Sequence, residues 1–293
     1  GNEVLNGAIA LILITCVVSS IVTERASRRM ALHEMEAAEP ETSDGERVLI
    51  SVSNPNTLFE LVSLAVLIRD SKNTDNVIAV NVVSDSDNRN VARSARQGKR
   101  FLEIAAQAAS GSGMTLKTVS RYSADVATGV IHTAKEQEAT TIILGIHRKL
   151  TAADSHSGPY SEAFLSRLHR EVVMIKMLMP FNTLRRIVVA VPPKAQFEPG
   201  FSKWMNHVLK VGRTLGCQIH FHCSHETAMF VRLIVDRQGY SDKVRIEQMD
   251  SWDEFMMLSA SVNYDHLLIA AASRPGGVSY LHDFEKLPDM LAQ

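Results

Sequence analysis

The apolar residues of this chain gather in short runs, and the stretches between these runs carry apolar residues at helical spacing. The first series of runs predicts five strands, at residues 47–52, 77–83, 114–119, 141–144 and 172–175. Uninterrupted apolar runs are typical of parallel strands that are buried on both faces of a sheet. Helices are expected between them, at residues 54–68, 90–110 and 125–138, with a shorter one before the last strand. This alternation predicts a doubly wound α/β domain.

A second series of runs repeats this plan. Residues 186–191 echo residues 47–52 almost position for position. Further strands are expected at residues 218–223, 244–249 and 267–271, with helices at 204–215, 231–238 and 252–262. No fifth apolar run follows, so either the second domain lacks its last strand or that strand lies beyond this sequence; we favour the latter. We predict two tandem flavodoxin-like domains, at 47–178 and 179–293, packed as a pseudo-symmetric pair that covers the sheet edge at 172–175.

The beginning of the chain has a different pattern. Residues 8–22 are uncharged and mostly apolar, and Arg25, Arg28 and Arg29 follow them. A membrane-spanning helix needs about 20 apolar residues, and basic residues mark its cytoplasmic side. A signal peptide would carry Lys or Arg before its apolar core, and none precedes this one. We interpret residues 1–27 as the C-terminal end of a last transmembrane helix; the alternative is a hydrophobic helix docked within a soluble dimer.

Charge and cysteine content narrow the class of protein. Residues 28–46 form an acidic linker, with six acidic residues and no Lys or Arg between His33 and Glu46. The whole chain has 31 basic and 32 acidic residues, so nothing points to a nucleic-acid partner. Three cysteines are too few for a disulfide framework and fit a reducing compartment.

The polar loop after the strand at 141–144 is the candidate for ligand chemistry. It starts at Gly145, carries His147 and Arg148, and closes at Gly158 before a short amphipathic helix. Glycines let backbone N–H groups approach an anion, and the N-terminus of the next helix adds partial positive charge. The loop is therefore a candidate phosphate-binding edge, although loops with two glycines are common and loop histidines often lie simply at the surface.

This loop resembles the nucleotide loop of the universal stress protein family. That family carries, after its fourth strand, a Gly, two residues, a second Gly, nine residues, and a third Gly followed by Ser or Thr. Gly145 and Gly158 stand at the first and third Gly positions with this spacing, while Arg148 and Pro159 replace the second Gly and the Ser or Thr. The resemblance implies two domains of the adenine nucleotide alpha hydrolase-like fold, with ATP or AMP as the expected ligand of the first domain.

Several departures from the family pattern predict weak nucleotide binding or none. Arg148 places a bulky side chain where backbone should meet phosphate, although its cation could also reach the phosphate. Pro159 removes an N–H group. Nucleotide-binding members carry an Asp just after the first strand, but residues 51–54 contain none, and the second domain has lost the loop at 270–277.

A second resemblance concerns residues 14–26. They are similar to the end of the final membrane helix in bacterial sodium/proton antiporters, of the monovalent cation:proton type that continues into cytoplasmic stress-protein domains. Its position directly before a stress-protein-like domain strengthens both resemblances. Together they imply a region that lies in the cytoplasm at the cell inner membrane, with the membrane transport domain of the same polypeptide as its partner.

Metal binding and catalysis are not expected. A cluster with spacings that resemble zinc ligands is formed by Cys217, His220, His222, Cys223 and His225. On a strand, the two cysteines and the first two histidines would point to opposite faces, so we expect small buried cysteines and half-exposed histidines instead. No catalytic triad, Cys-His pair or paired carboxylates can be recognised in the sequence.

We therefore interpret the chain as the non-catalytic regulatory region of a sodium or other cation/proton antiporter, a homodimer modulated by an adenine nucleotide. Two alternatives stay open: a stand-alone universal stress protein that binds or hydrolyses ATP, and a purely structural dimerisation module. The apolar run at 8–22 argues against the stand-alone protein.

Overall fold

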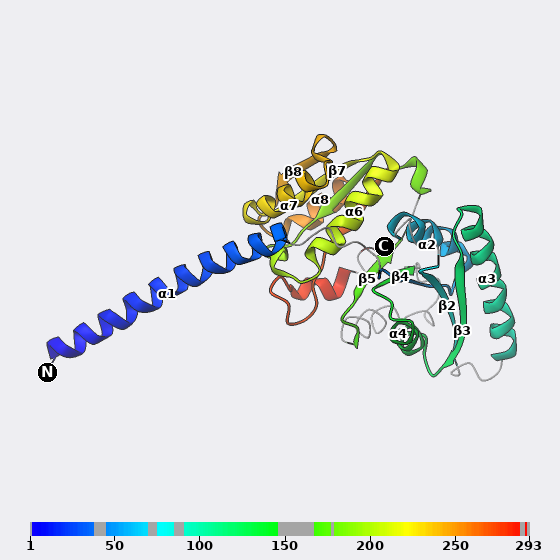
Figure 1. Ribbon diagram of the computed structural model, residues 1–293, viewed down its shortest axis with the longest axis horizontal. Coiled ribbons are helices and arrows are strands. Elements are labelled where there is room, and N and C mark those ends of the chain that lie inside the picture. Colours follow the sequence, from blue (N-terminus) through cyan, green and yellow to red (C-terminus); the bar gives the residue numbers. More distant parts are fainter. Residues whose placement is uncertain are drawn as a thin grey trace. The chain divides into compact units, whose positions relative to one another are not determined.

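The computed structural model describes residues 2–37, 45–69, 75–84, 91–145, 167–176, 179–287 and 291. It divides into two compact units, residues 1–42 and residues 43–293. In the first unit the structure describes one helix, α1 (Asn2–Ala37), drawn in blue in Figure 1. Within it, Leu5–Thr23 is long and apolar enough to cross a membrane. The helix expected over residues 8–22 is thus present, and its apolar side chains are exposed within this chain.

The second unit begins with a five-stranded parallel sheet, sheet A. Its strands are β1 (Val48–Ser51), β2 (Val77–Ser84), β3 (Leu116–Ser123), β4 (Thr141–Gly145) and β5 (Glu171–Ile175). The spatial order is β3-β2-β1-β4-β5, with Val48 level with both Val77 and Thr141. The chain therefore reverses direction across the sheet between β1 and β4, as in a doubly wound fold.

Helices cover both faces of sheet A (Figure 1). One face packs against α2 (Pro55–Ile68) and α3 (Val91–Gly111), and the other against α4 (Val126–Glu136). Side-chain alternation along β2 separates the two layers, because Asn81 points toward α3 and Val82 toward α4. The central strands are buried on both sides, which explains why they appear in the sequence as unbroken apolar runs.

A second parallel sheet, sheet B, follows in the same unit. Its strands are β6 (Arg186–Ala190), β7 (Gln218–Cys223), β8 (Val244–Gln248) and β9 (His266–Ala270). Their order, β8-β7-β6-β9, repeats the order of the first four strands of sheet A. The helices are α6 (Phe201–Leu215), α7 (His225–Arg237) and α8 (Glu254–Ser261), and Trp252, Phe255 and Phe284 form an aromatic cluster beside α8. The expected fold class, two parallel-sheet α/β domains after an apolar helix, is confirmed.

Three sequence-based expectations are corrected in detail. Helix α7 begins at His225, not Val231, because the side chain of Ser224 caps it by accepting a hydrogen bond from the Thr227 N–H. Strand β3 continues to Ser123, past residue 119, since every residue of it pairs with β2. His220 is not half-exposed: only 6% of its surface is accessible.

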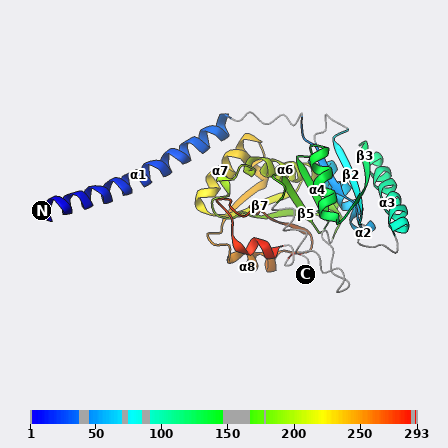
Figure 2. The ribbon, with the colours of Figure 1, turned by 90° about the horizontal axis from the view of Figure 1, so that it is seen from below.

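The two sheet domains contact each other through α2 and α6, the helices that follow the first strand of each sheet. Contact between equivalent helices is what a paired arrangement of the two repeats predicts. Helix α6 also lies next to β5, as Figures 1 and 2 show, and Val172, Val173 and Met174 on this edge strand are partly buried.

Candidate functional site

The predicted ligand edge is the carboxyl end of β1 and β4, where doubly wound sheets commonly bind their ligands. Gly145 is the last residue of β4 and is partly exposed at this edge. The other predicted site residues, His147, Arg148 and Gly158, lie outside the described residues, as does Pro159. Of the predicted nucleotide loop, the structure therefore locates only its first glycine.

Gly145 has a packing role that the sequence did not reveal. A Cβ at this position would lie 2.9 Å from Oγ1 of Thr57, in the first turn of α2. That turn is fixed by Asn54, whose side chain accepts a hydrogen bond from the Asn56 N–H, and by Pro55. Glycine at 145 thus lets the N-terminus of α2 approach the end of β4, whether or not a ligand binds there.

Asn81 is a buried polar residue near the same edge that sequence reasoning missed. Its Nδ2 donates a 2.7 Å hydrogen bond to the backbone carbonyl of Val52, and its Oδ1 faces Gly98 of α3. Val52 is fully buried. It lies within residues 51–54, the segment that corresponds to the Asp position of the family pattern. Asn81 is the single amide in the apolar run of β2. Because a buried polar side chain needs a hydrogen-bond partner, this residue could have been singled out from the sequence.

In the second domain, a carboxylate of the chain itself occupies the corresponding edge. Oε1 of Glu198, after β6, accepts hydrogen bonds from the Ser279 N–H (2.8 Å) and hydroxyl (3.0 Å). A Cβ at Gly277 would lie 2.7 Å from this oxygen, so the loop after β9 closes tightly on the carboxylate.

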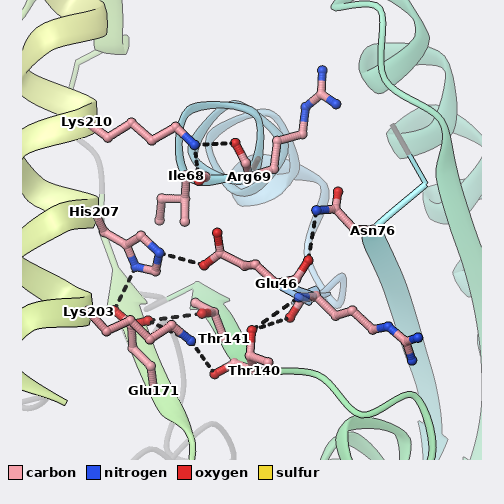
Figure 3. A network of polar contacts seen from close by, with 11 residues as sticks. Glu46, Ile68, Arg69, Asn76, Thr140, Thr141, Glu171, Lys203, His207 and Lys210 are labelled. Atoms are coloured by element: carbon pink, nitrogen blue, oxygen red, sulfur yellow. Dashed lines mark hydrogen bonds and ion pairs between the residues drawn. The ribbon is translucent and has the colours of Figure 1, made fainter. Parts of the chain in front are cut away.

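A second group of polar residues lies at the amino edge of sheet A, where its strands begin, opposite the carboxyl edge (Figure 3). Helix α6 brings three basic residues to it, Lys203, His207 and Lys210, at the spacing of one helix face. They meet segments of the first domain that are far apart in the sequence, including Glu46 before β1 and Glu171 at the start of β5. We call this group, with Thr140 and Thr141, the α6 cluster.

His207 bridges two carboxylates at the centre of the α6 cluster. Its Nδ1 lies 3.0 Å from Oε1 of Glu171, and its Nε2 lies 2.6 Å from Oε1 of Glu46. The three side chains are only 11%, 15% and 9% exposed, respectively. Burial alone lowers the pKa of His207, but the hydrogen bonds and charges of Glu171 and Glu46 outweigh it and raise this pKa to about 9.

The two lysines anchor the flanks of the α6 cluster. Nζ of Lys203 donates to the Thr140 carbonyl at 3.0 Å and lies 3.6 Å from Oε2 of Glu171. Nζ of Lys210 donates to the Ile68 and Arg69 carbonyls at 2.8 and 2.5 Å. These carbonyls belong to the C-terminal end of α2, where a cation stabilises unpaired carbonyl groups. Sequence reasoning did not find this cluster, because its members are scattered over the whole chain.

The cysteine and histidine cluster extends from Cys217, just before β7, to His225, the first residue of α7. In the described part of the chain no group of His, Cys, Asp and Glu side chains could hold a metal ion. The Cys217 thiol lies 3.2 Å from the Leu184 carbonyl, and burial raises its pKa; burial raises that of Cys223 to about 12. Protonated buried thiols are poor nucleophiles and metal ligands. His220 contacts Glu247 instead, with Nδ1 3.1 Å from Oε1.

Comparisons with known proteins bear on the fold. A scan against protein-family models finds no match, and a search of curated proteins finds no significant one. Among solved structures, a universal stress protein from Archaeoglobus fulgidus DSM 4304 matches with a TM-score of 0.51 and 14% identity, over 72% of this chain and 80% of that one. The two sheet domains have the universal stress protein fold.

Two further structures match more of the chain. The cytoplasmic domain of a prokaryotic cation chloride cotransporter has a TM-score of 0.56 at 9% identity, over 84% of this chain and 92% of its own. A protein of unknown function from Pseudomonas aeruginosa PAO1 has a TM-score of 0.51 at 12% identity, over 85% of this chain and 97% of its own. At these identities the likeness concerns the fold, and the antiporter resemblance of residues 14–26 stays a prediction.

Proposed function

We propose that this chain is the cytoplasmic regulatory region of a cation/proton antiporter at the bacterial inner membrane, without catalysis of its own. The observation that carries the proposal is the order of parts along the chain. A helix segment that is long and apolar enough to cross a membrane, Leu5–Thr23, precedes two stress-protein-like domains. Basic residues Arg25, Arg28 and Arg29 follow that segment, so the sheet domains would lie on the cytoplasmic side.

The same tandem fold in the cytoplasmic domain of a cation chloride cotransporter supports this proposal. It provides a precedent for a tandem α/β unit attached to an ion transporter. The partner of the sheet domains would then be the transport domain of the same polypeptide, and a homodimer is the assembly we expect.

Transport measurements test the proposal. Everted membrane vesicles from cells that express the complete gene should release protons when Na⁺ or K⁺ is added, as reported by a fluorescent pH probe. A variant without residues 47–293 should keep exchange but change its rate or its dependence on pH or nucleotide. Absence of cation-coupled proton movement with the complete gene would reject the proposal, and identical exchange with and without these residues would reject the regulatory role.

An adenine nucleotide is the ligand we propose for the carboxyl edge of sheet A. The N-terminus of α2 and the glycine at the end of β4 meet there. The backbone N–H groups of a helix N-terminus favour an anion, and a glycine lets the backbone approach a phosphate closely. Arg148 and Pro159 predict that the affinity is low, with ATP and AMP bound weakly. Calorimetry on the 293-residue chain should show no sub-micromolar ATP binding; tight binding, unchanged in Arg148→Gly, would show that Arg148 does not obstruct the loop.

A further inference from the structure

The geometry of His207 sets a requirement on its protonation. Both ring nitrogens face a carboxylate oxygen, at 2.6 and 3.0 Å, and a carboxylate can only accept hydrogen bonds. A neutral imidazole has one N–H group, so it would leave a nitrogen lone pair against one of these oxygens. Figure 3 shows both contacts, and only the doubly protonated ring satisfies them.

Charge balance gives the same answer. The carboxylates of Glu46 and Glu171 are countered by Lys203, 3.6 Å from Glu171, and by His207 when it is protonated. Deprotonation of His207 would leave one uncompensated negative charge among side chains that are mostly buried. An unpaired charge in such a place is unfavourable, and the group can regain solvation only if the contact opens.

Two other cations near the cluster, among the described residues, have contacts of their own. Arg47, next to Glu46, directs its guanidinium to Glu138, 3.0 Å away. Lys210, one turn beyond His207 on α6, contacts the carbonyls of Ile68 and Arg69 at the end of α2. On β5, Glu171 is the group that faces the imidazole, and its other oxygen accepts from the Thr141 hydroxyl at 3.0 Å.

The contact joins three parts of the molecule at one point. Glu46 ends the acidic segment that precedes the first domain, Glu171 starts the edge strand of that domain, and His207 belongs to the second. We propose that the α6 cluster is a pH-gated latch, which holds α6 against the amino edge of sheet A while His207 is protonated and releases it when His207 loses its proton.

The direction of the pH response follows from linkage. In the closed contact the pKa of His207 is raised to about 9, whereas a released histidine has a pKa near 6.5. The stabilisation is therefore complete below pH 6.5 and disappears as the pH rises through 9. Over this range the equilibrium constant for opening should rise on the order of a hundredfold, at tenfold per pKa unit. The latch does not depend on the proposed transport function and can exist without it.

Hydrogen exchange read by mass spectrometry tests the latch. The 293-residue chain, in mild detergent, is measured from pH 6 to 10, with rates corrected for the intrinsic pH dependence of exchange. Peptides that cover β5 should lose protection on the order of a hundredfold across this range. We call this pH-dependent loss of protection the step. In His207→Gln the same peptides should exchange quickly at every pH, without the step.

Two variants control for unrelated effects. His220→Gln removes a buried histidine that pairs with Glu247 away from the domain contact, and the step should remain. Lys210→Met removes a neighbouring contact of α6, which should speed exchange evenly while keeping the step. A wild-type chain without a step, or a step that persists in His207→Gln, overturns the proposal.

A variant that keeps the histidine covers the case in which His207→Gln does not fold. Glu46→Gln removes one of the two charges that favour the imidazolium, so the step should move to lower pH. A step at unchanged pH in Glu46→Gln overturns the proposal as well. Nitrogen-15 spectra of the histidine rings add a direct readout, because His207 should show two protonated nitrogens at pH 7.5.

Discussion

Asn81 and Gly98 constrain each other in the core of the first domain. A Cβ at position 98 would lie 1.9 Å from Oδ1 of Asn81, whose Nδ2 holds the Val52 carbonyl at 2.7 Å. Gly98→Ala should therefore displace the amide and lower the free energy of unfolding by about 1–3 kcal/mol, although alanine favours helix more than glycine does. Urea unfolding followed by circular dichroism measures this change.

Gly111→Ala is the matched control for Gly98→Ala. It lies at the end of the same helix, and a Cβ there would meet nothing within 4 Å. Its stability should equal or slightly exceed that of the wild type. An unfolding free energy of Gly98→Ala as high as that of the control would contradict the packing argument.

At this scale the sequence showed candidate chemistry but could not place it. The spacing of Gly145, Arg148 and Gly158 was readable as a loop, yet the contact of Gly145 with Thr57 depends on how α2 meets β4. His207 gave no signal, because one histidine on an amphipathic helix is ordinary. Its two carboxylates stand 161 and 36 residues away, so only the folded chain brings them together.

Among the elements, α4 owes its start to one side chain. Oδ1 of Asp125 accepts from the Thr128 N–H at 2.8 Å, and Oδ2 from the Thr128 hydroxyl at 2.7 Å. The hydrogen bond from the Thr128 N–H, with its hydroxyl and the Arg167 charge, lowers the pKa of Asp125 despite some burial. Asp125→Ala should lower the unfolding free energy by about 1 kcal/mol at pH 7, as measured in urea.

The pH dependence of this cap has a defined sign. Because the folded-state pKa of Asp125 is lowered, the charge contributes above the ordinary value of 3.8 and is lost as the pH falls through the lower folded value. The difference in unfolding free energy between wild type and Asp125→Ala should therefore become smaller at low pH. Asp125→Asn, which keeps an acceptor for the Thr128 N–H, should retain most of the stability at pH 7; a full loss would contradict the capping role.

Helix α1 gives a prediction about association. Its apolar side chains between Leu5 and Val22 are 44–63% exposed within this chain, and each leaves about 1.5–3 kcal/mol of burial energy unused. Without a bilayer we expect the chain to self-associate through this helix. Analytical ultracentrifugation should show a smaller species when residues 1–27 are removed, whereas removal of residues 1–7 alone should preserve association. Equal sedimentation of the full and shortened chains would exclude this role.

The strands were the easiest elements to predict, because runs such as residues 77–83 are buried on both faces and contain almost no polar residue. Helix starts were harder. Helix α7 begins six residues before the predicted residue 231, since its first turn is polar and depends on the Ser224 cap. Strand β3 was predicted too short for a related reason: its second half, from Ser120 to Ser123, is polar and partly exposed.

At the scale of the whole molecule, the repeat of the first strand was enough to predict two tandem domains of one fold. The contact between them was not predictable in detail, because its hydrogen bonds and ion pairs join residues that lie far apart in the sequence and share no sequence signal. Backbone carbonyls at the end of α2 and at Thr140 accept three of its hydrogen bonds, and every residue has a carbonyl, so the sequence does not single these out. The repeat thus predicts each domain, whereas the contact between the domains includes polar pairs, such as those of Lys203, His207 and Lys210, that only the folded chain reveals.

Glu171 makes the domain contact sensitive to acid. Burial raises the pKa of Glu171, but the hydrogen bond and charge of His207, with Lys203 and the Thr141 hydroxyl, bring it below 4.5 overall. Its stabilisation is thus present above pH 4.5 and lost as the pH falls through the folded value. Glu171→Gln should lower the unfolding free energy by about 1.5–3 kcal/mol at pH 7, because Lys203 loses its carboxylate and His207 keeps only that of Glu46. Urea titrations at pH 7 and pH 3.5 measure this, with Glu103→Gln on the exposed face of α3 as a control expected to change little. If the loss of unfolding free energy in Glu171→Gln is equally large at both pH values, the shape of the Glu171 side chain, and not its charge, stabilises the contact.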